Sequence, residues 1–106
     1  MWKIVYHKEA LVELKKLDKS QRVEVVKKIK QVAKNPLPRS EDGYGDPLGS
    51  KSGTKLSGFF KIKFQKSGLR VVYKVVRNNN EMQIIVVSAR EDDEVYQIAW
   101  KRRQKG

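Results

Sequence analysis

The chain has 106 residues, which suits one domain spanning 1–106 and is too short for two. It contains no cysteine, so disulfides and thiolate sites are excluded. The longest apolar run, Ile84 to Val87, is far below the ~20 residues that span a bilayer, and the N-terminus lacks an apolar signal core. A cytoplasmic protein is therefore the simplest expectation.

Positive charge dominates the composition. Lysine and arginine number 24 against 12 aspartates and glutamates, which gives a formal net charge of +12. Such an excess favours a polyanionic partner: nucleic acid, the ribosome, an anionic membrane or an acidic protein. A lysine-rich surface that only interacts with solvent is the alternative explanation.

The N-terminal third predicts a strand followed by two helices. Residues 2–6 resemble a short strand, and residues 9–17 carry leucines at helical spacing. Asp18 or Ser20 can cap a second helix over about 21–34, which has one apolar face and one basic face. Because so few residues join the two helices, we expect a helical hairpin.

Residues 36–58 contain all three prolines and five of the seven glycines, without periodicity. This composition predicts one long loop, either mobile or laid over the surface. Three strands then follow as a β-meander, at 59–66, 69–77 and 82–89. The last of them is nearly all apolar, as expected of a strand that is covered on both faces.

The end of the chain predicts a helix and a basic tail. Asp92 or Asp93 can cap the helix, which has acidic residues at its start and basic residues at its end, as the helix dipole favours. The tail, 102–106, can serve as an arm that adds electrostatic affinity for ribosomal RNA. The chain as a whole predicts an α+β fold.

The first two meander strands line up cations on one face. A two-residue turn at Ser67-Gly68 would place Lys63 opposite Val72 and Lys61 opposite Lys74. The basic face then holds Lys61, Lys63, Arg70 and Lys74, and the core face holds Ile62, Phe64, Leu69, Val71, Tyr73 and Val75. Like charges across a sheet cost stability, so this pattern favours phosphate binding over an ordinary exposed face.

A cationic face of this kind suits internal cleavage of RNA. The 2′-hydroxyl is the nucleophile, and the protein supplies a base, cations for the charge on phosphorus, and a proton for the departing 5′-oxygen. The one histidine, His7, excludes a two-histidine ribonuclease and lacks neighbours for a metal site. A tyrosine or lysine must then move protons, with a pKa lowered by the surrounding cations.

The stretches "GFFKIKFQKSGLRVVYKVV", "IIVVSAREDDEVY" and "AWKRR" resemble the RelE/ParE superfamily of toxins from toxin–antitoxin pairs, and most closely its RelE-type branch. The similarity covers 59–103 well, 35–60 loosely and the first 34 residues only in pattern. The resemblance implies a small single domain of order βααβββα, with the helical hairpin and the C-terminal helix on a mostly antiparallel sheet.

The resemblance also implies an mRNA endonuclease that cleaves in the ribosomal A site without metal or cofactor and leaves a 2′,3′-cyclic phosphate. Tyr96 would be the general base, Arg90 would neutralise the phosphorane and assist the leaving group, and Lys61, Lys63 and Arg70 would bind the phosphate. A guanidinium hardly loses a proton, so Lys63 is the easier acid. Expected partners are a cognate antitoxin, as a hetero-oligomer, and the ribosome with its message.

Several further residues are candidates for contact with RNA: Lys55, Lys74, Trp100, Lys101, Arg102 and Arg103. Trp100 lies one helical turn after Tyr96 and could stack on a base, although packing of the last helix is the favoured role. Many family members have an arginine where Ser57 stands here, and Lys55 is the nearest substitute. The acidic run 91–94 could hold Mg²⁺ but is already explained as a helix start.

Two other functions remain open. A ParE-like relative would use the same fold to inhibit DNA gyrase, and such proteins typically lack the Lys/Arg/Tyr group, so Tyr96 and Arg90 argue against it. If the chain is a basic RNA-binding module without catalysis, its binding to RNA should tolerate the loss of Tyr96.

Overall fold

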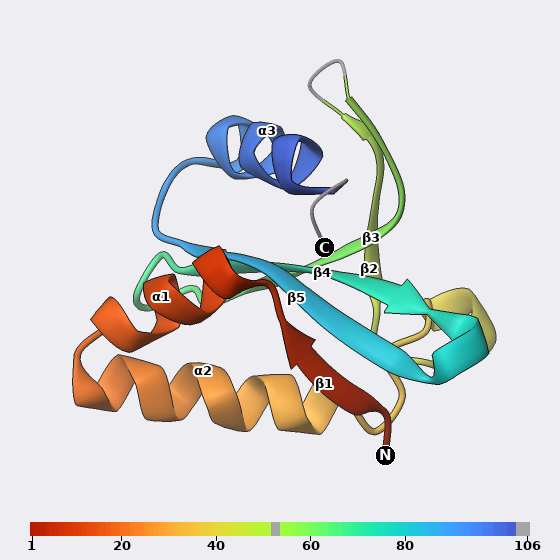
Figure 1. Cartoon of the computed structure of the whole chain (residues 1–106), viewed down its shortest axis with the longest axis horizontal. Coiled ribbons are helices and arrows are strands. Elements are labelled where there is room, and N and C mark those ends of the chain that lie inside the picture. The colour runs from red at the N-terminus through yellow and green to blue at the C-terminus, as the bar shows by residue number, and fades with distance from the viewer. Residues whose placement is uncertain (52–53, 104–106) are drawn as a thin grey trace.

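The computed structural model describes residues 1–51 and 54–103. Within these ranges it describes all side chains except those of residues 49–51, 54 and 55. Two helices lie on one face of a sheet and a third lies on the other (Figure 1). The elements in chain order are β1 (Lys3–Tyr6), α1 (Lys8–Lys16), α2 (Lys19–Val32), β2 (Asp46–Lys51), β3 (Thr54–Lys63), β4 (Arg70–Val76), β5 (Glu81–Ser88) and α3 (Asp92–Arg102). Short 3₁₀ turns occur at Arg39–Glu41 and Arg77–Asn79.

The strands form one sheet of order β1-β5-β4-β3-β2, in which only the β1–β5 pair is parallel. The α+β class, the helical hairpin and the mostly antiparallel sheet are confirmed. Asp18 caps α2, with its side chain accepting a hydrogen bond from the Gln21 N–H at 2.8 Å. The final helix starts one residue after Glu91, its N-cap, so neither Asp92 nor Asp93 is the cap.

The prediction of one loop over 36–58 is wrong. This segment contains β2 and the first half of β3, which pair from Asp46–Lys61 to Lys51–Thr54. The alternation that marks a strand is interrupted there by prolines and glycines, and the ladder itself shifts register between Pro47 and Gly49. Gly58 adopts a φ of +83° at this irregularity, which a side chain would disfavour.

The β3–β4 turn is longer than predicted. Lys63 lies opposite Arg70 and Lys61 opposite Val72, because Gln65–Gly68 form a four-residue loop. The Phe64 N–H donates to the Leu69 carbonyl at 2.9 Å and closes this loop. The true register is therefore displaced by two residues, a shift that keeps every side chain on its predicted face.

Two apolar clusters lie on the two faces of the sheet. The helical hairpin packs on the predicted core face of β3 and β4, through Ala10, Leu14, Val25, Ile29, Val32, Ile62, Leu69, Val71 and Tyr73. On the other face, α3 packs through Val95, Tyr96 and Ala99 against Leu48, Leu56, Phe59, Val72, Ile85 and Val86. β5 contributes to both clusters, which confirms that it is covered on both sides.

The β2–β3 ribbon rises beside α3 from the plane of the other strands (Figure 1). Lys61 is paired with Val72, and Val72 packs against α3. The basic face of the sheet is therefore the face that carries α3, and this helix covers only part of it. None of the described helices has the length and apolar character needed to cross a membrane.

Candidate functional site

Two cations and one carboxylate meet where β3 and β4 approach the start of α3. Lys63 and Arg70 are directly opposed across the strands. The Lys63 Nζ lies 2.9 Å from Asp92 Oδ2, and the Arg70 Nε donates to Asp92 Oδ1. The carboxylate offsets part of the repulsion, which explains how two like charges are tolerated at one cross-strand pair.

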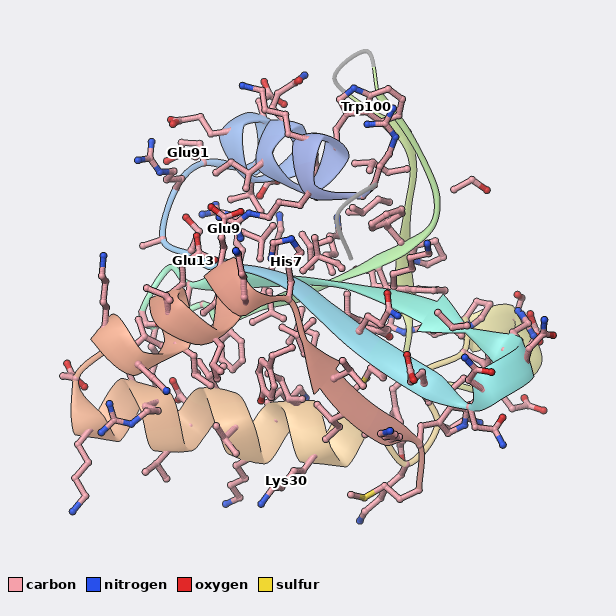
Figure 2. All side chains as sticks on the ribbon, viewed as in Figure 1. His7, Glu9, Glu13, Lys30, Glu91 and Trp100 are labelled. Atoms are coloured by element: carbon pink, nitrogen blue, oxygen red, sulfur yellow. The ribbon has the colours of Figure 1, made fainter. Side chains whose placement is uncertain are left out.

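Arg70 also fixes the backbone around this cluster. Its guanidinium donates to the carbonyl oxygens of Gly68 at 3.1 Å and Arg90 at 2.6 Å, and it lies 3.8 Å from Glu91. Figure 2 shows Glu91 at the start of α3. One arginine thus connects the β3–β4 loop to the β5–α3 connection.

Tyr96 lies one helical turn beyond Asp92, on the same side of α3. Its ring belongs to the cluster between α3 and the sheet, and the residue is only 3% exposed. The hydroxyl is buried without a hydrogen-bond partner among the described residues. Because a buried polar group normally has such a partner, this hydroxyl needs an explanation.

The pKa shifts in the cluster are opposite to those expected from the sequence. The pKa of Tyr96 is raised, mainly by burial and secondly by the Asp92 carboxylate, while Lys63 and Arg70 act more weakly to lower it. The pKa of Lys63 is also raised, chiefly because its ammonium donates a hydrogen bond to Asp92. The prediction that surrounding cations lower both pKa values is wrong for this state of the protein, since it omitted burial and Asp92.

Arg90 does not join this cluster through its side chain. Its guanidinium is largely exposed and pairs with Glu94 of α3 at 2.8 Å. With Glu94, Ile98 and Lys101 it lines a shallow hollow on the outer side of that helix. The structure therefore brings together Lys63, Arg70 and Tyr96, and places the Arg90 side chain elsewhere.

Lys61 shares the sheet face with Lys63 and lies opposite Asp46 in β2. Both lysines border an open groove of about 460 Å³ that reaches across to α2. A neighbouring groove of about 440 Å³ adjoins it along α2 and the β3–β4 loop. Their basic lining, apart from Lys61 and Lys63, is Lys27, Lys28, Arg39 and Lys66.

These four residues were not among the sequence-based candidates. The sequence identifies Lys27 and Lys28 only as part of the basic face of a helix, and that face alone does not show that it borders the end of β3. A basic helical face followed by a basic hairpin is the signal that could have indicated them.

The predicted RNA-contacting residues have varied positions. The Lys74 Nζ lies 5.9 Å from the centre of the Phe59 ring, and Lys101 is exposed. Trp100 packs at the edge of the α3 cluster, as favoured, and the Arg103 guanidinium lies over its ring at 3.3 Å. The Lys55 side chain and residues 104–106 of the basic tail lie outside what the structure describes.

Arg102 belongs to the fold rather than to a tail. It pairs with Glu13 of α1 at 2.8 Å and donates to the Ile85 carbonyl at 2.8 Å. Glu13 also accepts a hydrogen bond from the Val87 N–H at 3.0 Å. Glu13 and its neighbour Glu9 extend from α1 towards α3 (Figure 2). Because β1 ends its pairing with β5 at Ile84, these side chains satisfy the backbone of β5 beyond that point.

We expect Arg102→Ala to lower the free energy of unfolding by about 2 kcal/mol, because it leaves Glu13 and the Ile85 carbonyl without their partner. Urea denaturation measures this change. Lys101→Ala removes the same charge from an exposed neighbour and should stay within about 0.5 kcal/mol of wild type. Equal stability of the two variants would show that the Arg102 contacts contribute little.

His7 has a structural position. Its Nδ1 accepts a hydrogen bond from the Glu9 N–H at 3.1 Å and so caps α1. Within residues 1–51 and 54–103, no three histidines, cysteines, aspartates or glutamates gather in a way that could hold a metal ion.

The chain is similar to known toxins in both sequence and structure. Residues 4–94 match the family described as ParE toxin of the type II toxin–antitoxin system, parDE. The mRNA interferase toxin RelE of Escherichia coli (strain K12) is 32% identical over 97 residues, covering 92% of each chain. A free, doubly substituted form of E. coli RelE superposes with a TM-score of 0.76 at 29% identity, over 95% of this chain and 96% of that one.

A structure of the intact E. coli RelBE toxin–antitoxin complex is also similar, with a TM-score of 0.66 at 26% identity, over 86% of this chain and 99% of the matched one.

Proposed function

Because the chain belongs to the RelE/ParE superfamily of toxins from type II toxin–antitoxin systems, we propose that it is a ribosome-dependent mRNA endoribonuclease that cleaves in the A site and so inhibits translation. The observation that carries this proposal is the opposed pair Lys63 and Arg70, with a phenol on the adjacent helix. The matched relative from E. coli is named an mRNA interferase.

The proposed reaction uses the RNA's own nucleophile. The 2′-oxygen attacks the adjacent phosphorus and gives its proton to the Tyr96 phenolate, while the bond from phosphorus to the 5′-oxygen breaks. The products are a 2′,3′-cyclic phosphate and a 5′-hydroxyl, which takes its proton from a cationic side chain. Lys63 and Arg70 stabilise the negative charge on the non-bridging oxygens.

Two roles in this scheme remain to be separated. Lys63 can donate a proton to the 5′-oxygen, although Asp92 raises its pKa in the free protein. Arg90 would need to leave Glu94 before it could reach the phosphate. Lys61 and the basic grooves beside it are suited to the phosphates that flank the scissile one.

The direct test is translation of a defined message in a purified system, followed by primer extension. We expect cuts within codons only when ribosomes are present and the A site is vacant. Uncut message on stalled ribosomes at a toxin concentration that halts translation would overturn the proposal.

The second candidate is inhibition of DNA gyrase, because the matched family description names ParE. It requires no reacting phenol or paired cations. Supercoiling of relaxed plasmid by purified gyrase distinguishes the two functions. We expect the protein to leave supercoiling unchanged at concentrations that cut ribosome-bound message.

We also propose that a cognate antitoxin inhibits the protein by displacing α3, as a toxin–antitoxin complex is among the similar structures. The helix is held at both ends by ion pairs, Asp92 at its start and Arg102 at its end, for which an acidic segment can compete. Its apolar side could be replaced on the sheet by a partner helix. An error near 1 Å in the site can already cost ~10²-fold in rate.

Hydrogen exchange on the complex tests this displacement. We expect amides of residues 93–103 to lose protection when the purified antitoxin binds. A gain of protection there and at Lys61 and Lys63 would instead indicate direct coverage of the basic face. No change in either region, with cleavage still blocked, would contradict both and indicate that the complex is too large for the A site.

A further inference from the structure

The Asp92 carboxylate bridges Lys63 and Arg70, the two cations proposed to bind the RNA phosphate. Its two oxygens bind Lys63 and Arg70 separately, one oxygen to each cation. A phosphate bridging the same side chains would present two non-bridging oxygens in the same way. The carboxylate and a phosphodiester also carry the same charge, so they compete on equal electrostatic terms.

Capping of α3 does not explain the orientation of the Asp92 side chain. The N-cap of α3 is Glu91, and no side-chain hydrogen bond caps this helix. An aspartate in a first helical turn gains from the helix dipole wherever its side chain points. The observed orientation, across to β3 and β4, is therefore set by the two cations.

The neighbouring phenol supports the same conclusion independently. Tyr96 is on the same side of α3, one turn along, and its hydroxyl is buried without a partner among the described residues. A buried hydroxyl without a partner lies beside two cations that Asp92 already occupies. This arrangement is expected where a polar ligand binds between the hydroxyl and the cations.

We propose that Asp92 is an internal competitor for the phosphate site: it holds Lys63 and Arg70 in the free protein and must be displaced before an anion binds between them. The identification of that anion as an RNA phosphate rests on the proposed endoribonuclease function. Asp92 also raises the pKa of Tyr96, so one carboxylate acts both on the two cations and on the proposed base.

The test uses Asp92→Asn, which keeps the size of the side chain and removes its charge. Inorganic pyrophosphate is titrated into the full chain at low ionic strength, and the Arg70 Nε–H and Lys63 Nζ resonances report binding at this site. We expect the dissociation constant there to fall about tenfold. Asp93→Asn makes the same change of net charge in the same helical turn and should alter it less than about twofold. Equal constants for wild type and Asp92→Asn would overturn the proposal.

Asp92→Glu separates charge from loosening of the helix. It retains the competing carboxylate, so we expect pyrophosphate to bind about as weakly as it does to wild type. If Asp92→Glu binds as tightly as Asp92→Asn, the effect comes from a loosened helix and the competitor proposal is wrong.

The pH profile of single-turnover cleavage on programmed ribosomes tests the effect of the Asp92 charge on Tyr96. Because Asp92 raises the pKa of Tyr96, Asp92→Asn should shift the rising limb of the profile to lower pH. An unchanged profile would show that Asp92 does not act on the base. Tighter pyrophosphate binding by Asp92→Asn, with no cleavage by the wild-type protein, would overturn the endoribonuclease function and leave the anion competition supported.

Discussion

Replacing Tyr96 by phenylalanine is expected to lower the single-turnover rate of message cleavage on programmed ribosomes by at least ~10²-fold, because general-base loss typically has that effect. The substitution removes one oxygen and keeps the ring that packs between α3 and the sheet. Since the lost hydroxyl has no partner among the described residues, we expect the free energy of unfolding to stay the same or rise by up to about 1 kcal/mol.

This combination separates chemistry from folding. A residue with a purely structural role would lose stability and activity together, whereas Tyr96→Phe should lose activity alone. Tyr6→Phe is the matched control, because it removes a phenolic hydroxyl beside the opposite cluster, under the helical hairpin. We expect its cleavage rate to stay within about threefold of wild type.

Retention of cleavage by Tyr96→Phe within about threefold of wild type would remove this residue from the chemistry. If the protein is instead a basic module that binds RNA without cutting it, Tyr96→Phe should still bind the ribosome. Neither the wild type nor this variant should then cleave the message. Binding and cleavage are therefore measured on the same ribosome preparation.

The sequence predicted the faces of the strands better than their pairing. Lys61, Lys63 and Arg70 lie on one face as expected, because side chains alternate whatever the register. The predicted pairing of β3 with β4 was wrong by two residues, because Ser67-Gly68 can end either a two-residue or a four-residue loop. That difference decides the geometry of the candidate site, because it places Lys63 opposite Arg70 rather than Val72.

The electrostatic state of the site could not be obtained from the sequence. Asp92 was recognised only as a possible helix cap, and its partners are 29 and 22 residues away along the chain. The burial of Tyr96 was likewise hidden, because a tyrosine on a helix with mixed faces can point either way. Both effects raise the pKa of the phenol, and both depend on where α3 lies on the sheet.

The failure to predict β2 from the sequence has a related cause. β2 contains a proline and a glycine within six residues, and its pairing with β3 is irregular. A strand of this composition is stabilised by its partner more than by its own propensity. It nevertheless shapes the site, because Leu48 of β2 is part of the surface on which Tyr96 packs.

The last prediction concerns the ribosome: we expect a message free in solution to be cleaved at least ~10³-fold more slowly than the same message in the A site, where the reacting groups can be held in alignment. Two barriers in the free protein support this expectation. Asp92 occupies Lys63 and Arg70, and the Tyr96 hydroxyl is buried with a raised pKa. A flexible RNA in solution offers phosphates that must compete with the tethered Asp92 carboxylate, and a 2′-hydroxyl that is not aligned for attack.

By positioning the message, the ribosome can overcome the first barrier and supply the missing alignment. Holding one phosphate against Lys63 and Arg70 raises its effective concentration above that of free RNA, so Asp92 is displaced. Alignment of the 2′-oxygen with the leaving 5′-oxygen supplies much of the remaining rate advantage, because well-oriented groups gain several orders of magnitude.

The comparison uses one message at one toxin concentration, free and ribosome-bound, with single-turnover rates measured for each. A message carrying a 2′-deoxy nucleotide at the cut position is the control and should remain intact in both settings. Equal rates on free and bound message would contradict a dependence on the ribosome. They would also mean that RNA alone displaces Asp92, which the pyrophosphate titration of the wild-type protein measures separately.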